Sequence, residues 1–391
     1  MRTVYLDHNA TTRIDPAVVE AMLPFFSESF GNPSSHHAVG EAAAGAVRKA
    51  RRQVQTLIGA AQDSEIVFTS GGTESDNTAL LSALAALAPR NEIIVSAVEH
   101  PAVLTLCERL EAEGRARVHR IPVDRYGRID VAAYEHALCE RTAVVSFMWA
   151  NNETGTLFPV ETLAGKAKAA GALFHSDAVQ AAGRVPIRVE ETSISMMSLS
   201  AHKIAGPKGI GALYVRRKTP FYPLILGGRQ ERNRRGGTEN VPAIVGFGEA
   251  ADRAASRLES EAARMKALRD RLEQGLLGAV PGARVNGDPM ARLANTCNIA
   301  FEDVDGDGLL ALLAREGIAC SSGSACSAGS MQPSHVLQAM AVPASHLGGA
   351  VRFSLGRDND ESDIDHVLAV LPQLVMRLRQ PAGARKVART G

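Results

Sequence analysis

The sequence lacks the cysteine pattern of a disulfide-stapled or zinc-binding protein. Its five cysteines are an odd number and include no C-x-x-C pair, which argues against a disulfide framework and against a zinc site. Cys107, Cys139 and Cys297 have apolar neighbours and are expected to be small core residues. Cys320 is expected at a strand end. Cys326 differs, because its segment, SSGSACSAGS, is too rich in small residues to contribute to a core.

Long hydrophobic runs and a large net charge are also missing. No stretch of 18 apolar residues occurs, and the N-terminal MRTVYLDHNATT has no apolar signal core. The formal net charge is only +1, so neither nucleic acid nor a membrane surface is expected as a partner. We therefore predict a cytoplasmic protein, and its 391 residues are enough for two domains.

The sequence does contain a regular alternation of short β-rich runs and helical patterns. Runs such as EIVFT (65–69), EIIVSAVEH (92–100) and TAVVSFMWA (142–150) each precede a helical segment. Near-continuous apolar strands separated by helices predict a mostly parallel α/β sheet, with a ligand crevice at the carboxyl ends of its strands. A long helical stretch from Val241 to near Pro281 is expected to lead into a smaller α+β domain.

The most informative segment runs from Leu173 to Gly211. A short apolar strand ends in Asp177, and a second strand (195–200) leads into Lys203 and a Gly-Pro-Lys-Gly turn. Pyridoxal phosphate (PLP) needs an amine that binds its aldehyde and an acid that keeps its pyridine nitrogen protonated. Lys203 can supply the amine and Asp177 the acid. Either residue alone would more often be a surface lysine or an ordinary strand-end aspartate.

A glycine-rich turn between a predicted strand and a predicted helix adds a candidate anion site. It contains Gly72 and Thr73, where the backbone can approach an anion and the helix offers free N–H groups. Such a turn alone is weak evidence, but Ser200 and His202 add polar groups for a phosphate. The arginine-rich segment 229–235 indicates a phosphate or subunit contact rather than nucleic acid.

Further polar residues complete a candidate site. His100 ends a predicted strand and is suited to lie over an aromatic ring, although a strand-end histidine is often only a structural hydrogen-bonder. Asn152 and Gln180 can bond a ring oxygen. Arg352, in the apolar run AVRFSL, is either half of an ion pair or a clamp for a substrate carboxylate. Cys326 is a candidate nucleophile on a glycine-serine loop.

These motifs together resemble the cysteine desulfurases, PLP enzymes of fold type I that release alanine from cysteine and keep the sulfur as a persulfide. The matching segments include YLDHNATT, VFTSGGTESDN, ANNETGT, HSDAVQ, SAHKIAGPKGIG, RRGGTEN, SSGSACSAGS and VRFSLGR, spread over residues 4–357 in the family's order. SSGSAC is the loop signature of the first group. The amino-acid sequences of these segments are most similar to the nitrogen-fixation (NifS) type, with the housekeeping (IscS) type next.

The resemblance implies an α/β fold with two domains. The large PLP-binding domain (16–257) is expected to hold a mostly parallel seven-stranded sheet. The smaller α+β domain (1–15 and 258–378) is expected to carry the Cys326 loop. The segment 379–391 is basic and rich in small residues, and we predict a disordered tail.

The resemblance also assigns residues to roles. For the cofactor it implies Lys203, Gly72, Thr73, His100, Asn152, Asp177, Gln180, Ser200, His202 and, from a second subunit, Thr238. For the substrate carboxylate it implies Asn152 and Arg352, and for catalysis it implies Cys326, Lys203 and His100. The one candidate iron–sulfur ligand is Cys326, and no other metal site is expected.

The activity implied is conversion of L-cysteine to L-alanine by a homodimer, with a persulfide on Cys326. An iron–sulfur scaffold protein is the expected sulfur acceptor, in service of nitrogenase. Selenocysteine lyase, cysteine-sulfinate desulfinase and a PLP aminotransferase remain alternatives, and so does a non-catalytic sulfur carrier on this fold. Two departures stand out: Asp7-His8-Asn9 replaces the usual pair of asparagines, and Cys320 stands where a non-thiol residue is common.

Overall fold

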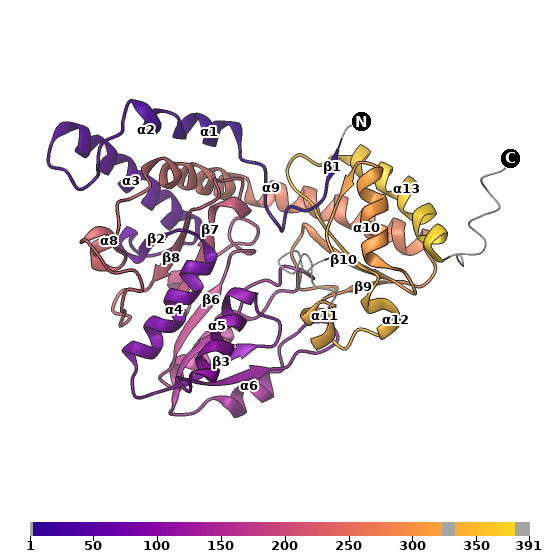
Figure 1. Cartoon of the computed structure of the whole chain (residues 1–391), viewed down its shortest axis with the longest axis horizontal. Coiled ribbons are helices and arrows are strands. Elements are labelled where there is room, and N and C mark those ends of the chain that lie inside the picture. Colours follow the sequence, from indigo (N-terminus) through magenta and orange to yellow (C-terminus); the bar gives the residue numbers. More distant parts are fainter. Residues whose placement is uncertain (1–2, 323–332, 380–391) are drawn as a thin grey trace.

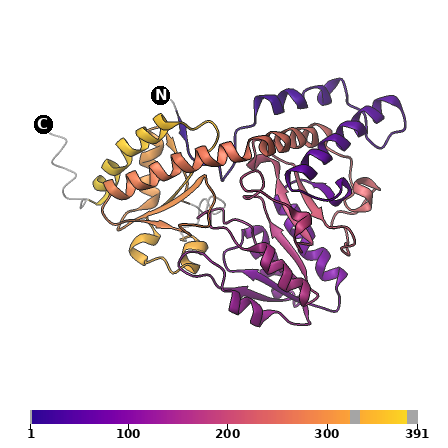
Figure 2. The same cartoon turned by 180° about the vertical axis from the view of Figure 1, so that it is seen from behind.

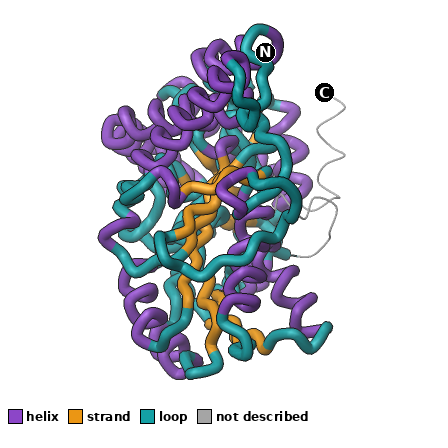
Figure 3. Tube along the Cα trace, turned by 90° about the vertical axis from the view of Figure 1, so that its left-hand side faces the viewer, coloured by secondary structure: helices purple, strands orange, loops and turns teal. Residues whose placement is uncertain are grey.

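The computed structural model describes residues 3–322 and 333–379. Its central feature is a seven-stranded sheet (Figures 1 and 3). In order across the sheet, the strands are β2 (Ile66–Thr69), β8 (Gly211–Val215), β7 (Met196–Ser200), β6 (Leu173–Asp177), β5 (Thr142–Ser146), β3 (Glu92–Ser96) and β4 (Arg117–Ile121). Only β8 runs antiparallel to its neighbours, so the predicted mostly parallel seven-stranded sheet is confirmed.

Helices cover both faces of this sheet, which explains why its strands are apolar on both sides. One face packs against α4 (Gly72–Ala86) and α5 (Pro101–Ala112), and the other packs against α3 (Ala38–Leu57), α6 (Val131–Ala137), α7 (Val160–Ala169) and the beginning of α9 (Val241–Ala279). Along β3, Ile93 belongs to the first of these cores and Ile94 to the second. Both side chains are fully buried, as the two-residue period of a strand requires.

A second, smaller body lies beside the sheet at the right of Figure 1. It contains the antiparallel sheet β12-β10-β9 (Ala350–Ser354, Thr296–Phe301 and Ala283–Asn286) and the parallel pair β1-β11 (Val4–Tyr5 and Ile318–Ala319). Its helices are α10 (Gly306–Arg315), α11 (His335–Ala339), α12 (Ala344–Leu347) and α13 (Glu361–Arg379). The chain beyond α13, where the tail was predicted, lies outside the described residues.

The helix α9 connects the two bodies, as Figure 2 shows from behind. It spans 39 residues and is capped by Asn240, whose side chain accepts a hydrogen bond from the Ala243 N–H. Phe247, near its start, lies in the core of the large sheet, whereas Leu272 lies in the core of the smaller body. The predicted domain boundary after residue 257 falls inside this helix and stays a prediction.

Short helices complete the fold. α1 (Pro16–Met22) and α2 (Pro24–Ser27) pack along α9, and α8 (Gln230–Asn233) lies just before it. Among the described residues, no helix combines the length and the apolar composition that a bilayer crossing requires.

Candidate active site

A cavity of about 380 Å³ lies where strand ends of the large sheet meet the N-terminal segment and β12. Ten predicted site residues line it: Gly72, Thr73, His100, Asn152, Asp177, Gln180, Ser200, His202, Lys203 and Arg352. Thr238 does not line it and is exposed on the segment between α8 and α9. Cys326 lies outside the described residues. The structure thus brings together residues that are up to 280 positions apart in the chain (72 to 352).

Lys203 reaches this cavity from the turn that follows β7. Its Nζ donates to the backbone carbonyls of Asn9 at 2.6 Å and Ala10 at 2.7 Å. Two further bonds attach the N-terminal segment to the same turn: the Thr12 N–H and hydroxyl both donate to the His202 carbonyl, at 3.0 and 2.8 Å. The N-terminal segment therefore forms one wall of the lysine pocket.

Asp177 ends the neighbouring strand, β6, and its carboxylate is held in a buried position. Its Oδ1 accepts a hydrogen bond from the Val179 N–H at 2.9 Å. Burial raises the pKa of Asp177, while His100 and Lys203 nearby act in the opposite direction. A cation placed against this carboxylate would stabilise its ionised form, which is what a protonated pyridine nitrogen supplies.

Two more buried carboxyl groups lie near Asp177. Burial and the charge of Asp177 raise the pKa of Asp76 well above its usual value, and burial raises the pKa of Glu99 to about 8. Within the described residues, the Asp76 Oδ1 has no hydrogen-bond partner. Neighbouring buried carboxyls disfavour one another's ionisation, so burial and mutual repulsion both favour the protonated forms of Asp76 and Glu99.

The N-terminus of α4 forms the end of the cavity that was predicted to bind phosphate. Gly71 has φ +155°, a backbone conformation that favours glycine. A Cβ on Gly72 would lie 2.9 Å from the Val179 side chain, so glycine at this position permits a close approach of α4 to the segment that follows β6. His202 faces this end with its pKa lowered to about 4, mainly by burial and then by Lys203.

His100 has the structural hydrogen-bonding role that is common for a strand-end histidine, and it also lies at the cavity. It caps α5, because its Nδ1 accepts a hydrogen bond from the Ala102 N–H at 3.1 Å. It also lines the cavity. The capping bond places the single proton of the neutral ring on Nε2.

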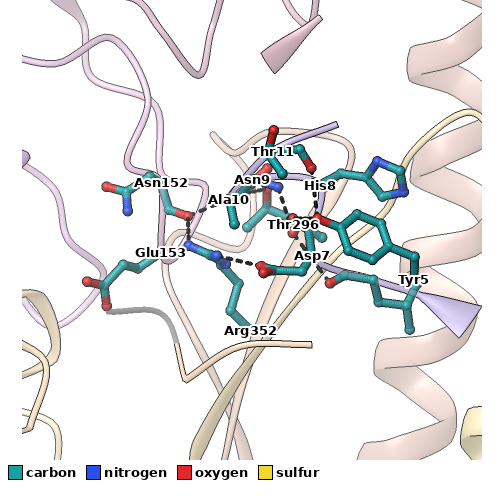
Figure 4. A network of polar contacts seen from close by, with 12 residues as sticks. Tyr5, Asp7, His8, Asn9, Ala10, Thr11, Asn152, Glu153, Thr296 and Arg352 are labelled. Carbon is teal, nitrogen blue, oxygen red and sulfur yellow. Dashed lines mark hydrogen bonds and ion pairs between the residues drawn. The ribbon is translucent and has the colours of Figure 1, made fainter. Parts of the chain in front are cut away.

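Arg352 is almost completely buried in β12 and is held by two contacts shown in Figure 4. Its Nη1 donates to the Asn152 carbonyl at 3.0 Å, and its Nη2 donates to the Asp7 Oδ1 at 2.7 Å. Arg352 therefore forms an ion pair, as one of its two interpretations predicted, and its partner is Asp7. The guanidinium still lines the cavity, so a substrate carboxylate remains a candidate partner.

Several cavity residues were missed by the sequence analysis: Asn9, Ala10, Asp76, Glu153 and His335. Asn9 and Ala10 contribute backbone carbonyls, which no side-chain pattern reveals. Glu153 accepts a hydrogen bond from the Ser334 hydroxyl at 2.6 Å. The only available signal was that Glu153 belongs to the ANNETGT segment and His335 to the segment PSHVLQAM (333–340), which also resembles the family.

Cys320 follows β11 directly, as predicted, and is only partly exposed. Burial and the nearby Asp7 raise its pKa to about 12. Since the thiolate is the reactive form of cysteine, this environment favours an inert thiol. Among the described residues, no group of three or more His, Cys, Asp or Glu side chains is arranged to hold a metal ion.

Comparison with known proteins identifies the family. A model of class-V aminotransferases matches residues 4–367. The chain belongs to this family. Its relatives include a protein of Gluconacetobacter diazotrophicus named cysteine desulfurase, which is 59% identical over 380 residues covering 97% of this chain and 95% of that protein. The cysteine desulfurase NifS of Azotobacter vinelandii is 56% identical over 379 residues, covering 97% and 94%.

Solved structures agree with this class-V assignment. A NifS-like protein superimposes with a TM-score of 0.90 at 38% identity and covers 97% of this chain and 100% of that one. A structure described as SspA in complex with cysteine has a TM-score of 0.79 at 35% identity, covering 90% and 98%. The predicted resemblance to cysteine desulfurases and the fold type are therefore confirmed.

The cavity residues fit PLP, the cofactor of these class-V enzymes. Lys203 offers an amine, and Asp177 offers a buried carboxyl. The start of α4 offers N–H groups to a phosphate. An amine, an acid and an anion site in one cavity are the three groups that bind PLP.

Proposed function

We propose that this chain is a cysteine desulfurase whose site is the cavity around Lys203. The observation that carries the proposal is the presence of Lys203, Asp177 and Arg352 in one cavity. Lys203 holds PLP, Asp177 pairs with the pyridine nitrogen, and Arg352 binds the carboxylate of L-cysteine. Conversion to L-alanine requires all three functions at one place.

The remaining cavity residues have supporting roles in this proposal. Gly72, Thr73, Ser200 and His202 hold the phosphate group, together with Thr238 of a second subunit. His100 stacks on the cofactor ring and moves protons through Nε2. Asn152 and Gln180 bind the ring oxygen, and Asn152 also contacts the substrate.

When bound, PLP stabilises negative charge on the substrate carbon. Arg352 would fix the substrate carboxylate, and the Lys203 amine would take up the proton of the substrate α-carbon. The Cys326 thiolate attacks the substrate sulfur, so that a new S–S bond forms and the carbon–sulfur bond breaks with its electron pair left on the carbon fragment. That fragment takes up protons and leaves as alanine.

The wider context of the proposal follows the NifS relatives. We expect a cytoplasmic homodimer that passes sulfur to an iron–sulfur scaffold protein, in service of nitrogenase. Cys326 carries the persulfide and can contact the cluster during transfer. The nearest alternative activity is that of a selenocysteine lyase or desulfinase, in which no cysteine needs to accept sulfur.

Replacing Cys326 with serine separates these activities. Cys326→Ser should retain PLP and bind cysteine, since the cavity around Lys203 is unchanged. Its alanine production should fall by several orders of magnitude, because a hydroxyl is a poor nucleophile toward sulfur. The measurements are alanine release and the mass of Cys326 peptides, which should gain one sulfur in the wild type. Alanine release at the wild-type rate would replace the desulfurase proposal with the lyase alternative.

A further inference from the structure

Arg184, on the turn that follows β6, is a cation held entirely by neutral groups. Among the described residues, no carboxylate lies within ion-pair distance of it. Its Nη1 donates to the Asn9 Oδ1 at 2.8 Å and to the Gln180 Oε1, and its Nη2 donates to the carbonyls of His8 and Lys203, each at 3.3 Å. Burial, and then the nearby Arg352, lower the pKa of Arg184 to about 10, so it stays charged at neutral pH.

These contacts determine the orientation of the Gln180 amide. A guanidinium can only donate, so the amide oxygen of Gln180 must face Arg184. The Nε2 of Gln180 then lies on the other side and donates to the Asn9 carbonyl at 2.9 Å, at the wall of the cavity. With Arg184 in place, Gln180 presents a donor and not an acceptor to this part of the site.

The same guanidinium connects the two chain segments that surround Lys203. It binds the carbonyl of Lys203 itself and the side chain of Asn9, whose carbonyl accepts a hydrogen bond from the Lys203 Nζ. The N-terminal segment and the lysine turn are about 190 residues apart in sequence, and Arg184 bonds to both. The His8 ring also packs closely against Gly356, where no side chain would fit.

We infer that Arg184 is a positioning residue of the cofactor site: it turns the Gln180 donor toward the cavity and fixes residues 8–10 against Lys203. The inference rests on the proposed binding of PLP to Lys203. Two consequences follow for the bound cofactor. The Gln180 donor favours an anionic ring oxygen, and the Arg184 charge disfavours a proton on the nitrogen of the lysine linkage.

The alternative is that Arg184 is purely structural and only holds the N-terminal segment against the turn that carries Lys203. Arg216 is a matched control for it, because within residues 3–322 and 333–379 the hydrogen bonds of that guanidinium also go only to neutral oxygens, those of Val189, Thr192 and Ile194. Neither guanidinium lines the cavity itself, but Arg184 bonds to Gln180 and Lys203, which do line it, whereas the hydrogen-bond partners of Arg216 do not. Arg184→Met and Arg216→Met therefore remove the same kind of side chain, one beside Lys203 and one away from it.

The test is a pH titration of the visible absorption of the holoenzyme, which reports protonation of the lysine linkage. In Arg184→Met, the midpoint should move up by about one pH unit or more, because a nearby positive charge and a donor are lost. Arg184→Lys should recover part of the shift, and Arg216→Met should show none. The other titratable groups that line the cavity stay the same in all variants: Asp76, His100, Glu153, Asp177, His202, His335 and Arg352.

Gln180→Leu provides a second measurement that does not depend on the folding of Arg184→Met. If Arg184 acts through Gln180, the midpoint shifts of Gln180→Leu and Arg184→Lys are not additive in the double variant. A wild-type midpoint in Arg184→Met or additive shifts in the double variant would overturn the inference. A wild-type protein without any lysine-linked absorption would instead overturn the proposed function.

Discussion

At the residue scale, the contact between Arg352 and Asp7 bears most directly on substrate binding. The proposed substrate carboxylate and the Asp7 carboxylate need the same guanidinium, and Asp7 already occupies one of its nitrogens at 2.7 Å. Arg352 is nearly inaccessible to solvent, whereas the Asp7 side chain is 20% exposed. Asp7 can therefore orient Arg352 with one nitrogen while the cavity side receives the substrate.

Replacing Arg352 tests this arrangement. Arg352→Ala should raise the KM for cysteine by roughly 10- to 100-fold, because a hydrogen bond to a charged group contributes about 1.5–3 kcal/mol. It also leaves the Asp7 carboxylate without this cation, so adding Asp7→Asn should recover part of the loss. Steady-state kinetics of both variants measure the effect. Reduced thermal stability with an unchanged KM would show that the ion pair is only structural.

At the element scale, the carboxyl ends of β6 and β7 explain why part of the site could be predicted from the sequence. Asp177 and Lys203 follow parallel strands that are neighbours in the sheet, and parallel strand ends share one edge. Their order along the sequence was therefore sufficient to predict a common cavity. The same reasoning could not predict the carbonyls of Asn9 and Ala10 or the contacts of Arg184, because these depend on how a distant N-terminal segment packs.

β6 also carries His175, a fully buried histidine inside the sheet. Its ring nitrogens contact the hydroxyls of Ser146 and Ser198, each at 2.8 Å. Burial lowers the pKa of His175 to about 3, compared with about 6.5 in an unfolded chain. The folded protein thus holds this ring neutral in a pH range where the unfolded chain takes up a proton.

This difference predicts a pH-dependent contribution of His175 to stability. The contribution is fully present above about pH 6.5 and is lost as the pH falls toward 3, by about 1.4 kcal/mol per pH unit. The free energy of unfolding of the wild type relative to His175→Gln should therefore drop by about 2 kcal/mol from pH 6.5 to pH 5. Denaturant unfolding at the two pH values measures it. An unchanged difference would mean that the ring is not held neutral.

At the scale of the whole molecule, one predicted site residue within the described part of the chain lies away from the cavity. Thr238 is exposed, although the resemblance places it at the phosphate of a second subunit. Apolar side chains are exposed close to it in the chain, among them Tyr222 at 58% and Leu226 at 79%. The segment that carries them is bonded to the one before Thr238, through the Gly236 N–H and the Ile225 carbonyl. Exposed apolar residues beside a site residue favour a subunit contact.

Placing a charge on this surface tests the dimer and the site together. Leu226→Asp should weaken the proposed homodimer, because burying an unpaired carboxylate at an interface is costly. Loss of the partner would remove Thr238 from the phosphate site, so the monomer should also lose PLP more readily on dialysis. Sedimentation velocity and retained cofactor absorbance measure the two effects. Met290→Asp is the matched control, since Met290 is 87% exposed on the loop before β10. A monomeric Leu226→Asp protein that keeps PLP as firmly as the wild type would show that each subunit completes its own site.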